Sequence, residues 1–271
     1  MIIARTFAYL TALVLLIGGR ALPAIGQATA QHTDHSPRHA EWVKLSSEAG
    51  KTLEAYLVYP ETSGPTASVV VIHENRGMTD WVKSVVDRLA AEGFVAIAPD
   101  LLSGKGPNSG GSASFATGDD LLKALSALTV EEIMQDLRAA VKYVRDLPST
   151  NEKVAVAGFC WGGHKAFLLA AHEPLLTASF VFYGTSATEQ YLESINCPIY
   201  GFYAENDNRV NATVPGAKAA LEEIGKVFQG ETYKGAGHGF MRAGTEPDAT
   251  PENKAAMEAG WIRWLKLLKA M

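Results

Sequence analysis

The sequence predicts an α/β fold, in which a mostly parallel, twisted sheet is covered by helices on both faces and preceded by an antiparallel hairpin. Two observations carry this prediction. Continuous runs of Val, Ala and Ile, as in residues 68–72, 94–98 and 153–157, are typical of strands buried on both faces of a parallel sheet. Segments with helical spacing of apolar residues lie between these runs, so strands and helices alternate along the chain.

Turn residues, glycines and prolines mark where the expected strands and helices begin and end. A turn at residues 48–50 joins the two strands of the hairpin, Gly93 ends the first helix, and Pro99 closes the strand that follows. The expected strands are residues 42–45, 53–59, 68–72, 94–98, 153–157, 178–183, 198–203 and 228–233. The expected helices are residues 81–91, 119–147 with a break near Thr129, a segment opened by Cys160, 214–226 and 251–268. A surface loop rich in Gly and Ser spans residues 101–118, and residues 41–271 are expected to form a single domain.

Charge and composition point to a small-molecule partner. The formal net charge is −5, and 47% of the residues are hydrophobic. There is no basic excess to attract nucleic acid or an anionic membrane. We therefore expect a small-molecule ligand, with no cofactor and no metal site in the domain.

The first thirty residues are typical of a secretory signal peptide. Arg5 precedes an apolar run from Phe7 to Ile17, and small residues follow up to Ala28-Thr29-Ala30 before Gln31. A membrane-spanning helix would need roughly 20 apolar residues, so an uncleaved anchor is not favoured. We expect export to the periplasm or the medium, with cleavage near Gln31 and no stable membrane insertion afterwards.

Residues 31–40 form a polar leader that contains three histidines, His32, His35 and His39. Histidines at this density can bind a metal. A solvated leader after the cleavage site also explains them and is the favoured interpretation.

Two cysteines are present, and their contexts argue against a disulfide between them. Cys197 precedes Pro198 at the start of an apolar strand, where a small buried thiol fits. Cys160 lies in a glycine-rich turn. A free thiol in an exported protein needs a reason, and catalysis supplies one.

The turn at Cys160 has the pattern of a nucleophile elbow. Gly158-Phe159-Cys160-Trp161-Gly162 reads G-x-C-x-G between a buried strand and a helix, with cysteine in the place of the usual serine. A sharp strand-to-helix turn strains the nucleophile and leaves no room for flanking side chains. The positive end of the helix favours a thiolate, and the Trp161 N–H is placed to stabilise an oxyanion. A buried cysteine in a glycine turn is the alternative, which the flanking strand and helix disfavour.

An acid and a histidine follow the nucleophile in the order expected for this elbow. Asp207 comes just after the strand at 198–203, with Glu205 as the competing carboxylate. His238 stands between glycines after the last strand, whereas His164 and His172 fall on the helix behind the elbow. We expect His238 to act as the base and Asp207 to orient it, in a Cys-His-Asp triad.

These segments resemble the dienelactone hydrolase family of α/β-hydrolases from about Trp42 to Leu268. The resemblance is carried by His73-Glu74-Asn75-Arg76-Gly77, Ala98-Pro99-Asp100-Leu101, Gly158-Phe159-Cys160-Trp161-Gly162-Gly163 and His238-Gly239-Phe240-Met241-Arg242. It implies an α/β-hydrolase fold, hydrolysis of carboxylic esters or lactones, and an acyl-thioester intermediate.

The resemblance also implies roles for residues outside the triad. Glu74 would lie beside Cys160 and keep it in the thiol form until substrate displaces the carboxylate. Glu74 could instead be a strand-end acid paired with Arg76. The Asn75 N–H would join that of Trp161 in the oxyanion hole. Arg242 matches an arginine that binds a substrate carboxylate, whereas the second such arginine is missing and only Lys105 stands near its place.

The pocket and the activity are open to alternatives at this point. Trp81, Phe115, Tyr183 and Phe240 are expected to shape the substrate pocket, or else to pack in the core or on the surface. Besides ester hydrolysis, the chain could be a ligand-binding protein on a hydrolase scaffold that has lost turnover. A thiol redox role would need a resolving cysteine near Cys160, and Cys197 is expected at the opposite end of the sheet.

Overall fold

A computed structural model describes residues 38–48 and 50–271. The predicted signal peptide and residues 31–37 of the leader lie outside the described residues. His39 is described, and its imidazole lies 3.5 Å from the Glu41 carboxylate. No helix in the described part of the chain is long and apolar enough to cross a membrane.

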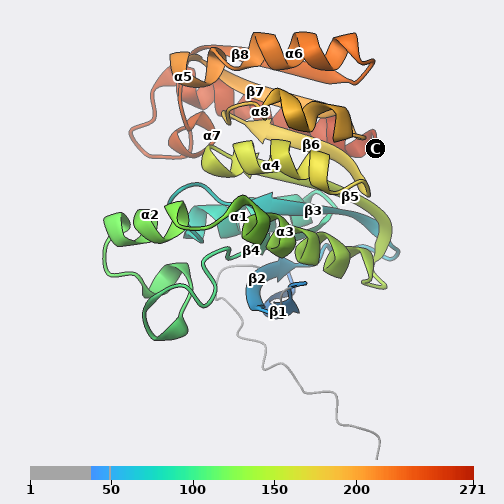
Figure 1. Cartoon of the computed structure of the whole chain (residues 1–271), viewed down its shortest axis with the longest axis vertical. Helices are drawn as coiled ribbons and strands as arrows, with labels where there is room; N and C mark the ends of the chain where they lie inside the picture. Colours follow the sequence, from blue (N-terminus) through green and yellow to red (C-terminus); the bar gives the residue numbers. More distant parts are fainter. Residues whose placement is uncertain (1–37, 49) are drawn as a thin grey trace, which may run out of the picture.

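The core of the molecule is an eight-stranded mixed sheet in the order β1-β2-β4-β3-β5-β6-β7-β8. β1 and β2 form the predicted antiparallel hairpin, and β2 also pairs antiparallel with β4; every other pair of neighbouring strands is parallel. The strands are β1 (Ala40–Ser46), β2 (Thr52–Val58), β3 (Thr66–Ile72), β4 (Val95–Pro99), β5 (Thr150–Phe159), β6 (Leu176–Phe182), β7 (Ile199–Asn206) and β8 (Phe228–Gly237). This arrangement confirms the predicted fold class (Figure 1).

Helices cover both faces of the sheet. α3 (Val130–Arg145), α4 (Trp161–His172) and α6 (Val214–Glu223) pack on one face, and α1 (Asp80–Ala91) and α8 (Pro251–Lys269) pack on the other (Figure 1). The remaining helical segments are α2 (Gly118–Ser126), α5 (Asn208–Asn211), α7 (Phe240–Ala243) and the 3-10 turns Pro107–Ser109, Ser112–Ser114 and Glu189–Ser194.

The continuous apolar runs in the sequence arise because each central strand serves two cores. Along β3, Val70 and Ile72 face the α3 and α4 side, whereas Val69 and Val71 face the α1 and α8 side, and all four are fully buried. The predicted break near Thr129 is real, because Thr129 caps α3 in a capping box with Glu132.

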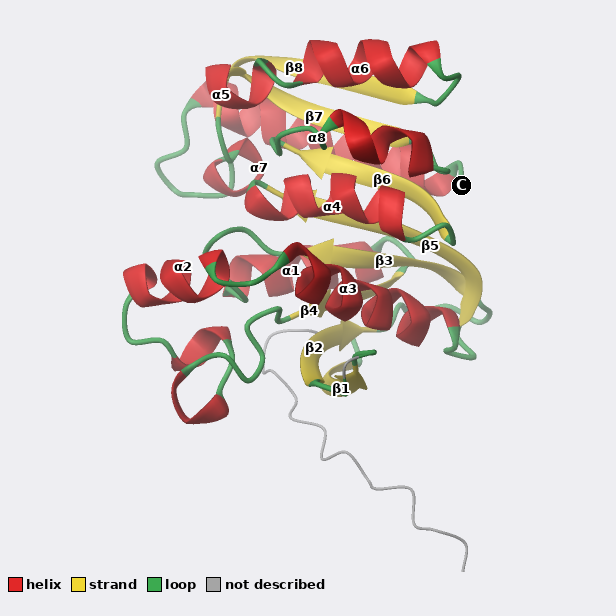
Figure 2. Ribbon diagram, viewed as in Figure 1, coloured by secondary structure: helices red, strands yellow, loops and turns green. Residues whose placement is uncertain are grey.

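Two short helices, α5 and α7, were not predicted. Each has four residues, too few to show a periodic pattern. They follow β7 and β8 at the carboxyl end of the sheet, the edge to which the strand arrows point in Figure 2. The elbow, the candidate acid and the candidate histidine all lie at this edge, where ligand chemistry gathers in parallel sheets.

Candidate active site

Cys160 occupies a strained backbone position between β5 and α4. Its φ of 55° and ψ of −113° lie in a region that side-chain-bearing residues rarely adopt. A Cβ added to Gly158 would lie 1.9 Å from the Gly162 carbonyl oxygen, and one added to Gly162 would lie 2.4 Å from the His73 carbonyl oxygen. Both glycines are therefore required by the close approach of backbone to backbone, as the sequence pattern predicts.

The structure brings Cys160, His238 and Asp207 together from three separate elements. The Cys160 sulfur lies 3.0 Å from His238 Nε2, and His238 Nδ1 lies 2.5 Å from Asp207 Oδ2. The Asp207 side chain is 6% exposed and caps α5 by accepting a hydrogen bond from the Val210 N–H, while His238 is 35% exposed. Hydrogen bonding to the Cys160 sulfur, which outweighs burial, and the Asp207 carboxylate together raise the pKa of His238 to about 9.

The competing residues have structural contacts instead. Glu205 accepts a hydrogen bond of 2.8 Å from the Gly235 N–H, so it fastens the end of β7 to β8. His164 Nδ1 lies 3.1 Å from the Thr185 carbonyl oxygen, and His172 Nδ1 lies 2.8 Å from that of Leu168. In the described part of the chain, none of these three side chains forms a hydrogen bond with the Cys160 sulfur.

Cys160 and Cys197 are both free, as expected. Cys197 is buried just before the amino end of β7, and burial raises the pKa of its thiol to about 12. Cys160 lies at the carboxyl end of β5, so the length of the sheet separates the two thiols. This placement removes the resolving cysteine that a redox role would need.

The two expected oxyanion donors, the backbone N–H groups of Asn75 and Trp161, come at the carboxyl ends of neighbouring strands. Asn75 follows β3, Trp161 opens α4, and among the described residues neither N–H donates a hydrogen bond. The fully buried His73 ring lies parallel to the Trp161 ring, with centroids 5.6 Å apart. Burial lowers the pKa of His73, so its imidazole is neutral and serves as a packing surface under Trp161.

Glu74 is buried beside this group of residues, but its partner differs from both expectations. Its carboxylate accepts a hydrogen bond of 2.8 Å from Arg242 Nε, so it pairs neither with the Cys160 thiol nor with Arg76. The Arg242 guanidinium, expected from the family resemblance to bind a substrate carboxylate, is held by Glu74 and lies 3.9 Å from Glu246. Arg242 is 27% exposed, and Glu74 is 6% exposed.

Three of the candidate substrate-binding residues make structural contacts. Phe240 is fully buried, with its ring 5.3 Å from Tyr183 and 5.0 Å from Tyr233, so it belongs to the core. Tyr183 is also fully buried. The Lys105 ammonium forms an ion pair with the Glu132 carboxylate at 2.7 Å.

The other two aromatic residues keep some exposed surface. Trp81 packs edge-on against Phe159 at 5.0 Å and adjoins the same core as Cys160, so it remains a candidate wall of the site. Phe115 packs on an apolar cluster formed by Leu102, Leu121 and Leu125.

Sequence reasoning missed how Tyr183 supports the histidine. The Tyr183 ring packs edge-on against the His238 imidazole, with centroids 5.2 Å apart, and its φ of 39° is strained. Burial, with the charges of Glu74 and Cys160, raises the pKa of Tyr183 well above the usual value. No sequence signal separates this tyrosine from an ordinary strand-end aromatic.

An elbow between strand and helix, an acid after β7 and a histidine after β8 define an α/β-hydrolase with cysteine at the elbow. The chain belongs to the dienelactone hydrolase family, whose family model matches residues 53–271. It is accordingly a hydrolase.

Relatives and solved structures agree with this assignment. A "Putative carboxymethylenebutenolidase" of Escherichia coli (strain K12) is 32% identical over 235 residues, which cover 81% of this chain and 83% of the relative. A protein of the same name from Aquifex aeolicus is 32% identical and covers 78% of this chain and 90% of its own length. The crystal structure of a "Putative Dienelactone Hydrolase" from Klebsiella pneumoniae superposes with a TM-score of 0.75 at 25% identity, covering 86% of this chain and 98% of that one.

Proposed function

We propose that this hydrolase cleaves carboxylic ester or lactone bonds, with Cys160 as nucleophile, His238 as proton carrier and Asp207 as the residue that orients His238. One observation carries the proposal: the Cys160 sulfur lies 3.0 Å from His238 Nε2, while His238 Nδ1 lies 2.5 Å from Asp207. Nucleophile, base and orienting acid within hydrogen-bond reach of one another are the arrangement that acyl transfer requires.

Acylation begins with attack of the Cys160 sulfur on the ester carbonyl carbon. A C–S bond forms, and the carbonyl π electrons move to oxygen, which accepts hydrogen bonds from the N–H groups of Asn75 and Trp161 in this proposal. As the tetrahedral intermediate collapses, the C–O bond to the leaving alkoxide breaks and the His238 imidazolium protonates that alkoxide. With a lactone, the released alcohol stays attached to the acyl group.

Deacylation reverses the roles with water as the nucleophile. Neutral His238 accepts a proton from water as the hydroxide oxygen bonds to the thioester carbonyl carbon. Collapse of the second intermediate breaks the C–S bond and releases a carboxylic acid together with the Cys160 thiolate and the imidazolium. Asp207 stabilises the imidazolium in both half-reactions without accepting its proton.

The thiolate nucleophile supports activated esters and enol lactones as the substrate class. A thiolate is a better leaving group than an alkoxide or an amide, so acylation by thiolate favours substrates with stabilised leaving groups over peptides. Arg242 is held by Glu74, so the recognition of a substrate carboxylate by that arginine would require the pair to open.

The proposal is tested with the two free cysteines as a matched pair. Cys160→Ala should abolish hydrolysis of an activated aryl ester, whereas Cys197→Ala, which removes a buried thiol, should keep it. Mass spectrometry of the wild type, quenched during turnover, should show one acyl group on Cys160. Wild-type turnover by Cys160→Ala would refute the proposal, and a stable acyl adduct without product release would favour a ligand-binding protein on this scaffold.

A further inference from the structure

Asp100, at the end of β4, is a buried carboxylate that the proposed reaction does not use. It is 5% exposed, and no lysine or arginine forms an ion pair with it in the described part of the chain. A buried charge without a counterion must be satisfied by hydrogen-bond donors. Its donors come from one place, the loop that follows it.

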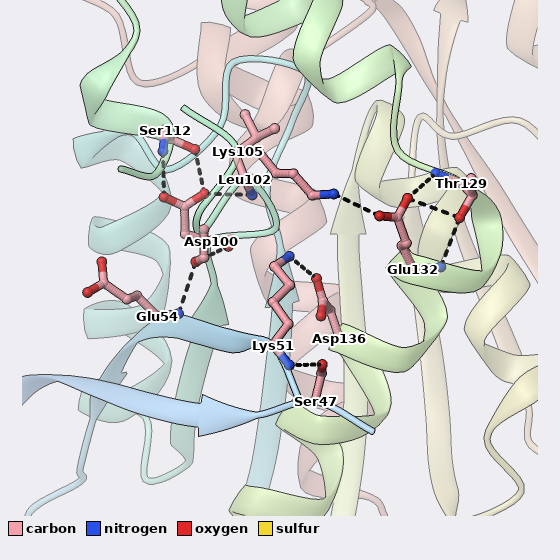
Figure 3. A network of polar contacts seen from close by, with 11 residues as sticks. Ser47, Lys51, Glu54, Asp100, Leu102, Lys105, Ser112, Thr129, Glu132 and Asp136 are labelled. Atoms are coloured by element: carbon pink, nitrogen blue, oxygen red, sulfur yellow. Dashed lines mark hydrogen bonds and ion pairs between the residues drawn. The ribbon is translucent and has the colours of Figure 1, made fainter. Parts of the chain in front are cut away.

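The Asp100 carboxylate closes this loop on itself (Figure 3). Oδ1 accepts hydrogen bonds from the Ser112 hydroxyl at 2.6 Å and the Leu102 N–H at 3.0 Å, and Oδ2 accepts one from the Ser112 N–H at 2.7 Å. Gly111 packs so closely that an added Cβ would lie 2.3 Å from Oδ2. Asp100 and Ser112, twelve positions apart in the sequence, are therefore joined by hydrogen bonds at a buried point. We call this contact the Asp100–Ser112 clasp.

The far side of the clasp rests on the turn that carries Asn75. The Gly77 N–H donates to the Glu74 carbonyl oxygen at 3.2 Å, which closes a turn over residues 74–77. Gly77 has a φ of 69°, and a Cβ added there would lie 2.3 Å from the Ser112 hydroxyl oxygen. Ser112 thus abuts the last residue of this turn. From the other side, His73 Nδ1 donates to the Glu74 carbonyl oxygen at 2.7 Å.

Asp100 also holds Leu102, which packs near the second expected oxyanion donor, Trp161. Leu102, whose N–H is held by Asp100, joins Leu121 and Leu125 in a small apolar cluster, and the Trp161 side chain packs against that cluster. The other face of the Trp161 segment is fixed by the His73 ring and by the contact of Gly162 with the His73 carbonyl. The turn that contains Asn75 and the Trp161 side chain are thus both packed against residues that Asp100 holds in place.

We propose that Asp100, acting through Ser112 and Leu102, is a positioning residue for the oxyanion hole, which places the Asn75 and Trp161 N–H groups without contacting substrate. The inference rests on the proposed function, because it assigns an oxyanion to be stabilised. Removal of one oxyanion donor typically lowers kcat by about 100- to 1000-fold, so partial misplacement of a donor should cost about 10-fold or more.

The test separates stabilisation of the oxyanion from the reactivity of the sulfur. Acylation by an activated aryl ester needs both, whereas alkylation by iodoacetamide forms no oxyanion and needs only the Cys160 thiolate. Ser112→Ala, a mild change, should lower the acylation rate about 10-fold, and Asp100→Asn should lower it further, with alkylation unchanged within about twofold. The loss should fall on kcat, with KM little altered, because substrate binding is not touched.

Ser114→Ala is the matched control. Ser114 lies in the same loop, and its hydroxyl donates a hydrogen bond of 2.7 Å to the Gly111 carbonyl oxygen, but it contacts neither Asp100 nor Gly77. Its acylation and alkylation rates should match those of the wild type.

Three outcomes would overturn the inference: unchanged acylation in Ser112→Ala, a parallel fall of acylation and alkylation, or an equal loss in Ser114→Ala. Ser112→Ala keeps the test decisive if Asp100→Asn fails to fold. Failure of the proposed function looks different, because Cys160→Ala would then retain ester turnover, and the positioning role would fall with it.

Discussion

Replacement of Arg242 with methionine would remove the one ion-pair partner that the described residues provide for Glu74. The two side chains lie 2.8 Å apart, with Glu74 6% and Arg242 27% exposed. Breaking a buried pair from one side typically costs about 3–5 kcal/mol, because the remaining charge is left uncompensated. Since more than a quarter of Arg242 is exposed, we expect the lower end, a loss of about 3 kcal/mol in the free energy of unfolding.

The double variant Glu74→Gln, Arg242→Met should be more stable than Arg242→Met alone. It contains no uncompensated charge, so we expect it to regain about 2 kcal/mol. The alkylation rate of Cys160 should follow the same pattern. An unpaired Glu74 charge near the sulfur disfavours the thiolate in the single variant, and removal of that charge restores the thiolate.

Urea unfolding at neutral pH, followed by tryptophan fluorescence, measures both free energies. Lys269→Met is the control, because the Lys269–Glu92 pair has a similar separation of 2.7 Å but is 56% and 34% exposed. We expect that control to lose no more than about 0.5 kcal/mol. The reasoning would be refuted if Arg242→Met lost no more than Lys269→Met, or if Glu74→Gln deepened the loss.

Two further predictions concern the histidine and the elbow. The pKa of His238 is raised from 6.5 to about 9, so the imidazolium and the stability it contributes are present at neutral pH and are lost as pH rises toward and through 9. The rate of acylation by an alkyl ester should therefore fall above about pH 9, whereas the rate with a nitrophenyl ester, whose leaving group needs no proton, should not. Asp207→Asn should shift this fall to lower pH. Identical pH profiles for the two esters would contradict the role of His238 as proton donor. Gly162→Ala would place a Cβ 2.4 Å from the His73 carbonyl oxygen and should cost about 1–3 kcal/mol of stability together with most ester turnover. Gly216→Ala, in α6 with no atom within 4 Å of the new Cβ, should instead be neutral or stabilising in the same urea unfolding assay, and equal losses in the two variants would rule out the steric argument.

Residues whose chemistry depends on local chain geometry could be identified from the sequence. The elbow is such a case, because Gly158 and Gly162 are demanded by contacts within one strand–turn–helix unit and with the adjacent strand. Asp207 and His238 each follow a strand whose apolar run marks that strand as part of one parallel sheet. The carboxyl ends of these strands therefore lie at one edge of the sheet. The order of the three residues along the chain then gave each a role.

The missed elements and contacts had no comparable signal. α5 and α7 are one turn each, and the turn at α7 rotates Phe240 into the core instead of toward a ligand. The alternation of residues along a strand predicts which face of the sheet a side chain lies on. A four-residue helix after the strand turns the backbone, so the alternation no longer predicts where the following side chains point.

The sequence by itself determined the α/β sheet with its hairpin and a cysteine, an acid and a histidine at one edge, because periodicity and glycine spacing are local properties that the chain records directly. Only the tertiary structure decided which charge meets which: Glu74 pairs with Arg242, 168 residues away, and Lys105 with Glu132. It also decided that Asp100 fastens Ser112 against the turn of Asn75. Such contacts depend on how loops and long side chains pack across the sheet, and no pattern along the chain encodes that packing.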